Sequence, residues 1–172
     1  MNVSQLLTKS ARTFPQNLAL VYGPKRLTYA QFNARVNRLA NALCRLGIQQ
    51  GDNVAVLQYN YPETLESIFA CFKAGCGCVP INFRLHPNEF AFIIDHAEAK
   101  AVILSPEFNE TMSTIRDPFA NARHFITLSN AEGELLDYEK MISAELDQFR
   151  DVDTKPDDLA WLFYTSGTTG MP

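Results

Sequence analysis

The sequence predicts an α/β fold in which a mostly parallel sheet is covered by helices on both faces, the doubly wound, Rossmann-like arrangement. Short runs of continuous apolar residues are typical of buried parallel strands, and helical patterns alternate with these runs along the chain. The composition agrees with this class. Of the 172 residues, 47% are apolar and 20% are charged, as in a globular protein near the size of one domain.

The first clear element is a helix over residues 28–46. Thr28 and Gln31 have the spacing of a capping box, and Gly47 can adopt the left-handed conformation that ends many helices. The apolar residues of this segment recur at steps of three and four, which places them on one face. They are Phe32, Val36, Leu39, Leu43 and Leu46.

A strand, a helix and a second strand are expected next. The run Asn53–Gln58 is rich in Val and predicts a buried strand. Pro62 and Glu63 are typical of a first helical turn, and Gly75 of a helix end. The second strand is Cys78–Ile81. The apolar face of the helix is predicted to contain Leu65, Ile68, Phe69 and Phe72.

The same alternation continues toward residue 128. Pro87 and Glu89 open a further helix, whose apolar residues are Phe90, Ile93 and Ile94. The runs Ala101–Leu104 and His124–Leu128 predict two more strands, separated by another helical stretch. The order of strands and helices therefore indicates parallel strands joined by crossovers.

The last part of the chain is more polar before it becomes apolar again. One amphipathic helix is predicted by Leu135, Tyr138, Met141, Ile142 and Leu146. The stretch DVDTKPDD, residues 151–158, is expected to be a connector, and Leu159–Phe163 a buried strand. We expect residues 1–158 to form an α/β subdomain, and residues 159–172 a strand with the start of a ligand-binding loop.

Charge and apolar patterning argue against a nucleic-acid partner and a membrane span, respectively. The net charge is −4, and residues 1–129 hold 12 Lys and Arg against 9 Asp and Glu, while residues 130–172 hold 3 against 10. No clustered basic stripe is present, so a nucleic-acid partner is not expected. No stretch approaches the roughly 20 apolar residues of a membrane helix, and the start does not resemble a secretion signal. We therefore predict a cytoplasmic protein.

The residues with reactive side chains do not form a recognisable catalytic set. Cys71, Cys76 and Cys78 lack paired CxxC spacing, so we interpret them, together with Cys44, as buried reduced thiols rather than metal ligands. His86 is expected to cap a helix, His96 to lie near its end and His124 to begin a strand, with no catalytic role for any of them. Arg84 is interpreted as structural, and no metal site is predicted.

The loop TSGTTG follows the last predicted strand. In open parallel sheets, ligands bind at the carboxyl ends of strands. Gly167 and Gly170 lack a Cβ, so backbone N–H groups can approach an anion, and the neighbouring hydroxyls can donate to it. The candidate phosphate-binding residues are Thr165, Ser166, Gly167, Thr168, Thr169 and Gly170. Composition alone also fits an unliganded surface turn, and neither a Walker A loop nor a GxGxxG fingerprint is present.

The stretch FYTSGTTGMP resembles the phosphate-loop signature of AMP-forming acyl-CoA synthetases and ligases, the adenylate-forming enzymes. Tyr164 to Gly170 and Pro172 match the motif, and Met171 occupies its variable position. Upstream, LTYAQFNARVNRLANAL resembles the family's first long helix, GDNVAVL its next strand, and FKAGCGCVPINFRLHPNEFAFIIDHAEAKAVI the following strand–helix–strand unit. The resemblance is weakest over residues 105–158. It favours the fatty-acyl or aryl-CoA ligase branch over the peptide-synthetase branch.

The resemblance implies an acid–thiol ligase that uses ATP, Mg²⁺ and coenzyme A. The carboxylate of an acid, with a fatty acid favoured, would attack the α-phosphorus of Mg-ATP, and the acyl group would then pass to the coenzyme A thiol. The residues from Thr165 to Gly170 would hold the β- and γ-phosphates. The family's loop lysine, adenine site, acyl pocket and carboxy-terminal domain have no counterpart here. We therefore expect an inactive amino-terminal fragment with weak ATP binding, produced by design, processing or a shortened gene.

A second function, from a different class, is left open by the sequence. A shortened chain could act as a non-catalytic interaction module, binding a partner through its exposed sheet edge or through the acidic 130–158 region. Because the strand Leu159–Phe163 would lack a cover on its outer edge, we also expect a disordered loop or self-association through that edge.

Overall fold

The computed structural model describes residues 2–116 and 119–165, and its main sheet is entirely parallel. The strand order is β4-β3-β5-β6-β7, so the chain crosses to one side of β3 and then returns past it to the other. Neighbouring strands pair in parallel throughout, as predicted from their continuous apolar runs. The strands are β3 (Asn53–Leu57), β4 (Gly77–Pro80), β5 (Ala99–Leu104), β6 (His124–Thr127) and β7 (Leu136–Asp137).

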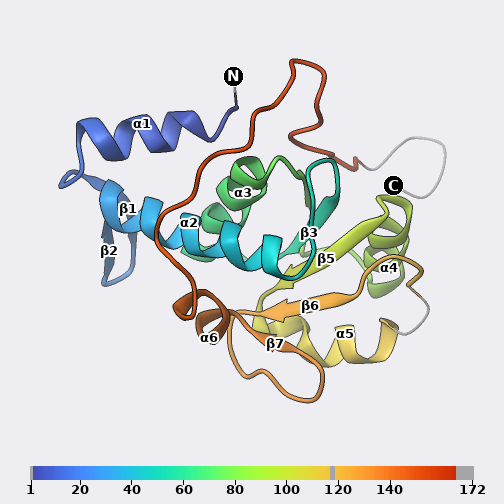
Figure 1. The fold of residues 1–172 in the computed structure, drawn as a ribbon. Coiled ribbons are helices and arrows are strands. Elements are labelled where there is room, and N and C mark those ends of the chain that lie inside the picture. Colours follow the sequence, from blue (N-terminus) through green and yellow to red (C-terminus); the bar gives the residue numbers. More distant parts are fainter. Residues whose placement is uncertain (1, 117–118, 166–172) are drawn as a thin grey trace.

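Helices cover both faces of this sheet, which confirms the predicted doubly wound class (Figure 1). One apolar core lies between the sheet and helices α1, α2, α3 and α6, and a second lies between the opposite face, α4, α5 and η1. The bounds are α1 (Gln5–Thr13), α2 (Tyr29–Arg45), α3 (Pro62–Ala74), α4 (Pro87–His96), η1 (Pro106–Phe108), α5 (Asn109–Ile115) and α6 (Tyr138–Ser143). In the part of the chain described, no helix has the length and apolar character needed to cross a membrane.

The helix ends follow the local signals in the sequence. The Thr28 hydroxyl accepts from the Gln31 N–H and the Gln31 side chain accepts from the Thr28 N–H, which completes the predicted capping box of α2. His86 caps α4 as expected, because its Nδ1 accepts from the backbone N–H of Asn88. Gly47 and Gly75 have positive φ angles of 87° and 71°, the conformation predicted for helix ends.

The amino-terminal elements were not predicted from the sequence. Helix α1 and an antiparallel hairpin of β1 (Leu18–Tyr22) and β2 (Lys25–Thr28) precede α2. Figure 1 shows them at one end of the molecule, with α4 and α5 at the other. Few of their apolar residues are buried, since Leu7 is the buried residue of α1 and Leu20 that of the hairpin. The run Leu18–Tyr22 is wholly apolar, so the hairpin carried a local signal that the prediction did not use.

Two predictions about the helices need correction. The helix expected from Leu135 to Leu146 is shorter, because Leu136–Asp137 pairs with β6 and α6 ends at Ser143. Leu146 is 76% exposed and belongs to no apolar face. In α3, Leu65 was expected to be buried but is 45% exposed, since the helix turns its other apolar residues toward the core.

The segment between α6 and the predicted connector, residues 144–150, is held mainly by side-chain amides from α2. Asn37 donates to the carbonyl of Asp147, and Asn41 to those of Leu146 and Gln148. Further along, the ammonium of buried Lys73 lies 2.9 Å from the Asp151 carboxylate. Residues 151–158 form neither helix nor strand, which confirms the predicted connector.

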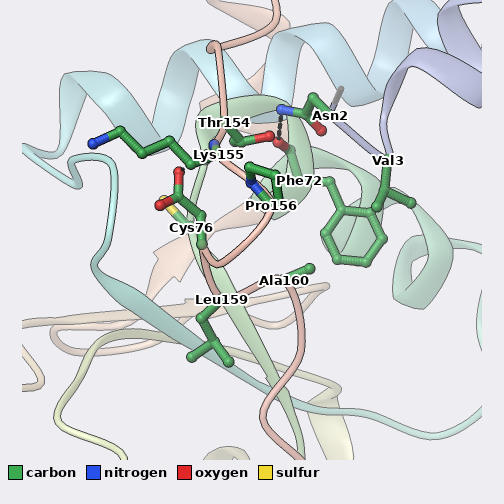
Figure 2. Close-up of a pocket in the computed structure, with 11 residues that line it drawn as sticks. Asn2, Val3, Phe72, Cys76, Thr154, Lys155, Pro156, Leu159 and Ala160 are labelled. Carbon is green, nitrogen blue, oxygen red and sulfur yellow. Dashed lines mark hydrogen bonds between the residues drawn. The ribbon is translucent and has the colours of Figure 1, made fainter.

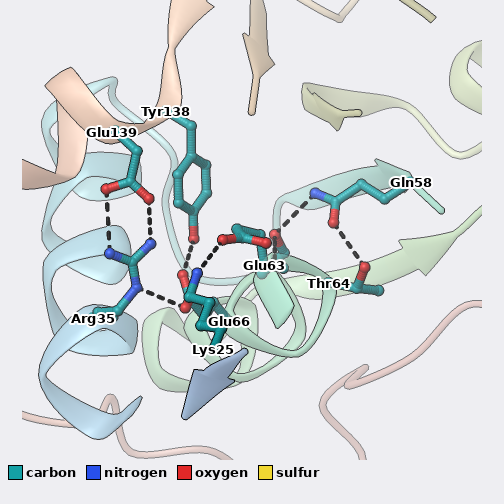
Figure 3. Close-up of polar contacts among 9 residues, drawn as sticks. Lys25, Arg35, Gln58, Glu63, Thr64, Glu66, Tyr138 and Glu139 are labelled. Atoms are coloured by element: carbon teal, nitrogen blue, oxygen red, sulfur yellow. Dashed lines mark hydrogen bonds and ion pairs between the residues drawn. The ribbon is translucent and has the colours of Figure 1, made fainter. Parts of the chain in front are cut away.

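A group of polar and charged side chains around the buried Glu66 joins three helices, and we call Arg35, Glu66, Tyr138 and Glu139 the polar clamp (Figure 3). Both oxygens of the fully buried Glu66 carboxylate are used, because Arg35 Nε and the Tyr138 hydroxyl each donate to it over 2.7 Å. Burial and the charge of Glu66 raise the pKa of Tyr138 well above its usual value. Burial opposes the charge on Arg35, but hydrogen bonds to Glu139 and Glu66 raise its pKa overall. The clamp therefore fixes α2, α3 and α6 together.

Candidate functional site

The segment that leads into the predicted phosphate loop lies beside β4, and we call residues 159–165 the stem. The N–H of Cys78 donates to the carbonyl of Ala160, and the N–H of Leu162 donates to the carbonyl of Cys78, both over 2.9 Å. These two bonds make one parallel bridge between Cys78 and Trp161. The stem therefore runs in the direction of β4, at the edge of the sheet.

The stem is not the buried strand that the sequence predicted for Leu159–Phe163. It makes one bridge rather than a ladder, and Leu159 and Phe163 are 47% and 64% exposed. The physical reason is its edge position, since no strand in the described part of the chain lies beyond it. An apolar run alone cannot distinguish a central strand from such an edge segment.

From Trp161 to Tyr164 the side chains alternate between the two faces of the sheet. Trp161 packs on the α3 side, as does Ala160, and the centre of its ring lies 5.2 Å from that of Phe72 and 5.1 Å from that of Phe163. Leu162 and Tyr164 pack on the α4 side. This alternation is that of an extended chain.

Tyr164, the first residue of the YTSGTTG signature, contacts the last turn of α4. Its hydroxyl lies 2.7 Å from Nδ1 of His96, and the two rings meet edge to face. Burial raises the pKa of Tyr164 above its usual value. Sequence reasoning gave His96 no role, because 68 residues separate the two partners and no local pattern connects them.

Of the six residues predicted to bind phosphate, the structure places the first. Thr165 is exposed at the end of the stem. The other five, residues 166–170, lie outside the described residues. Their role in phosphate binding and the predicted position of the loop at a carboxyl end of the sheet therefore stay predictions.

A small pocket lies behind the start of the stem (Figure 2). It has a volume of about 170 Å³ and lies between the amino-terminal segment, the end of α3 and the connector. Asn2 closes one side by donating to the carbonyl of Phe72 over 2.6 Å. Small-molecule sites usually span about 300–1,000 Å³, so this pocket is too small for a nucleotide. A groove of about 490 Å³ along α1 contains no residue of the stem.

The structure corrects one of the predicted cysteine positions. Cys71, Cys76 and Cys78 are buried free thiols as expected, but Cys44 is exposed on α2. Within residues 2–116 and 119–165, no three His, Cys, Asp or Glu side chains form a group that could hold a metal ion. Arg84 is exposed, and its guanidinium lies 5.5 Å from the centre of the Phe83 ring.

The fold and the stem define a doubly wound α/β protein whose last described segment lies at the edge of the parallel sheet and leads into a glycine- and hydroxyl-rich sequence. Comparison with known proteins identifies the family. The family model described as AMP-binding enzyme matches residues 7–172, and the chain belongs to this family.

Three similar proteins are informative. A feruloyl-CoA synthase of Amycolatopsis sp is 37% identical over 168 residues, which cover 95% of this chain and 30% of that protein. A long-chain-fatty-acid–CoA ligase of Thermus thermophilus is 35% identical over 148 residues, covering 86% and 27%. The crystal structure of the anthranilate CoA ligase AuaEII in complex with anthranoyl-AMP has a TM-score of 0.96 at 26% identity, covering 100% and 33%. The chain thus spans about a third or less of these proteins.

Proposed function

We propose that this chain supplies the first part of the nucleotide-handling domain of an ATP-dependent carboxylic acid–CoA ligase, an acid–thiol ligase that forms AMP. The observation that carries the proposal is the run TSGTTG, which follows an edge stem of the sheet in a chain that belongs to the AMP-binding enzyme family. The names of the three similar proteins support it, because each acts as a CoA ligase or synthase on a carboxylic acid.

The residues from Thr165 to Gly170 would hold the β- and γ-phosphates of ATP. Backbone N–H groups near Gly167 and Gly170 and the four hydroxyls would donate to phosphate oxygens. Hydrogen bonds to charged oxygens are worth roughly 1.5–3 kcal/mol, about twice a neutral one. The loop would thus position the departing pyrophosphate rather than take part in covalent chemistry.

The reaction would proceed in two steps. A carboxylate oxygen of the acid attacks the α-phosphorus of ATP, the bond to the bridging oxygen breaks and pyrophosphate leaves with Mg²⁺. The thiolate of coenzyme A then attacks the carbonyl of the acyl-adenylate and AMP leaves. We propose a fatty acid as the substrate. The Thermus relative supports this choice, while the feruloyl-CoA and anthranilate relatives make an aromatic acid the alternative that an assay must separate.

We test the proposal on the product of the complete gene. Pyrophosphate release is measured with Mg-ATP and coenzyme A against fatty acids of several lengths and against ferulate, anthranilate and benzoate. We expect release with at least one acid, and its strong loss when Gly167 or Gly170 is replaced by Val. Full turnover in both glycine variants would contradict the role of the loop, and no release with any acid would contradict the ligase activity.

We also propose that the 172-residue chain alone is inactive and that the protein is cytoplasmic. A nucleotide held by this loop alone would keep much of its hydration, so binding would be weak. Three buried free thiols are compatible with a reducing compartment. Acyl-adenylate formation by the isolated chain would contradict the first point.

A second candidate function rests on the exposed edge. Leu159 and Phe163 expose apolar surface beside the single bridge of the stem, which favours a non-catalytic module that pairs with a partner or with a second copy of this chain. A complete gene product without pyrophosphate release, but with concentration-dependent association, would favour this function over the ligase.

A further inference from the structure

The contact between His96 and Tyr164 is the hydrogen bond furthest along the described chain. The hydroxyl of Tyr164 lies 2.7 Å from Nδ1 of His96, and the ring planes meet at 88° with centres 5.7 Å apart. His96 is itself supported from behind, because its ring stacks on Phe92 with centres 5.3 Å apart and 28° between the planes. The imidazole is therefore held on the surface of α4 rather than free to rotate.

The stem brings Tyr164 to this imidazole by two further constraints. The N–H of Leu162 donates to the carbonyl of Cys78, which fixes the backbone two residues earlier. The side chains of Leu162 and Tyr164 both pack against the apolar core on the α4 side. Backbone pairing, apolar contact and the hydrogen bond to His96 thus hold consecutive residues of the stem. Exposed Thr165 directly follows the last of these residues, Tyr164.

We propose that His96 is a positioning residue for the phosphate loop, because through the Tyr164 hydroxyl it fixes the point on α4 from which the loop begins. The inference rests on the proposed function and adds to it a residue outside the family signature. His96 would touch neither ATP nor the acid. Its effect would reach the phosphates through the backbone of Tyr164 and Thr165, and displacements of about 1 Å are enough to slow a reaction substantially.

The chemistry of the contact suits this role. A tyrosine hydroxyl ionises only at about pH 10, so at neutral pH the hydroxyl of Tyr164 keeps its proton and can either donate or accept. The contact can therefore form with either tautomer of the imidazole. A phenylalanine at position 164 would keep the apolar packing and lose only the hydroxyl.

The test compares His96→Ala, Tyr164→Phe and the double variant in the complete gene product. We expect each single change to raise the KM for Mg-ATP about three- to tenfold, the range for one lost hydrogen bond, with the KM for the acid unchanged. The KM for Mg-ATP of the double variant should be no higher than the higher KM of the two single variants, because both changes remove the same interaction. His96→Asn should restore part of the affinity, since its amide can bond to the hydroxyl.

Tyr61→Phe is the matched control. It also removes a tyrosine hydroxyl, which donates to the Glu107 carboxylate over 2.6 Å, but Tyr61 does not belong to the stem. We expect its KM for Mg-ATP to equal that of the unchanged protein. Additive effects of the two changes in the double variant would overturn the inference. So would an equal increase of the KM for Mg-ATP and the KM for the acid.

Trp161 gives a second readout that does not depend on activity. It is the one tryptophan of the 172 residues and lies three residues before Tyr164 in the stem. In the 172-residue chain, His96→Ala and Tyr164→Phe should increase quenching of Trp161 by acrylamide, and Tyr61→Phe should not. Pyrophosphate release by the complete gene product, together with unchanged quenching of Trp161 in the His96 and Tyr164 variants of the 172-residue chain, would overturn the positioning role and leave the proposed function standing. No pyrophosphate release with any acid would overturn the proposed function, and with it the positioning role, whatever Trp161 reports.

Discussion

The polar clamp and the stem differ in how completely their side chains are enclosed. In the clamp, the Glu66 carboxylate is fully buried and both of its oxygens accept hydrogen bonds from other helices. In the stem, one bridge holds the backbone while Leu159 and Phe163 remain 47% and 64% exposed. The comparison predicts that removing the buried carboxylate of Glu66 costs more stability than polar substitutions at the exposed stem residues Leu159 and Phe163.

Removing the buried carboxylate of the clamp should have the largest effect. Glu66→Ala leaves the Arg35 guanidinium and the Tyr138 hydroxyl without their buried partner, and breaking such a pair costs about 3–5 kcal/mol. We expect a loss of this size in the free energy of unfolding, measured with urea. Glu139→Ala is the control, because Glu139 is 53% exposed and its ion pair should contribute about 1 kcal/mol or less. Equal losses would contradict the distinction.

The same contrast explains which parts of the fold could be predicted from the sequence. Helix α2 and strands β3 to β6 were predictable because their signals are local, such as the capping box of Thr28 and Gln31 and the apolar runs. The hairpin of β1 and β2 was missed although Leu18–Tyr22 is a wholly apolar run, and most of its residues are not buried in the structure. The signature around Tyr164 pointed to the family and to a candidate site by resemblance, not by periodicity.

Long-range partners could not be predicted at all. Glu66 and Tyr138 are 72 residues apart, and His96 and Tyr164 are 68 apart. Neither pair has a sequence pattern that connects its members, because packing of distant elements brings them together. The exposure of the stem was missed for a related reason, since burial of an apolar run depends on what lies beside it.

A methyl group at Gly77 should have the next largest effect, where the sheet meets the stem. A Cβ at this position would lie 2.2 Å from Oδ1 of Asn53 and 3.0 Å from Cδ2 of Leu159. The Asn53 amide is not free to move, because its nitrogen donates to the carbonyl of Ala97 over 2.7 Å. We expect Gly77→Ala to lower the free energy of unfolding by about 1–3 kcal/mol.

A double variant checks the cause of that loss. Asn53→Ala removes the obstructing oxygen, so the pair Asn53→Ala and Gly77→Ala should be more stable than the sum of the two single effects predicts. Simple additivity would mean that the methyl group at position 77 acts through another contact.

At alkaline pH, buried thiols should lower the free energy of unfolding more than exposed thiols. Burial raises the pKa of Cys76 to about 12 in the folded chain, whereas the pKa of a cysteine thiol in the unfolded chain is about 8.5. Between these values the unfolded chain loses a proton that the folded chain keeps. The free energy of unfolding should therefore fall as pH rises through this window, by up to about 1.4 kcal/mol per pH unit for this thiol.

The variant Cys76→Ala should remove that share of the slope, measured by urea unfolding at several pH values from neutral to strongly alkaline. Cys44→Ala is the comparison: Cys44 is exposed on α2, burial raises its pKa too, and its charge adds to the raised pKa of Cys76, so this variant should change the slope less than Cys76→Ala. An unchanged slope in Cys76→Ala would show that the thiol ionises equally in both states.

Polar substitutions in the stem should have the smallest effect on stability. Phe163→Ser and Leu159→Ser replace side chains that are 64% and 47% exposed, so the free energy of unfolding should fall by about 1 kcal/mol or less. If the exposed edge mediates self-association, sedimentation should show less association in both variants. Leu146→Ser is the control, because Leu146 is 76% exposed in the segment after α6 and lies outside the stem. A loss of stability as large as that of Glu66→Ala would mean that the stem is a structural part of the core.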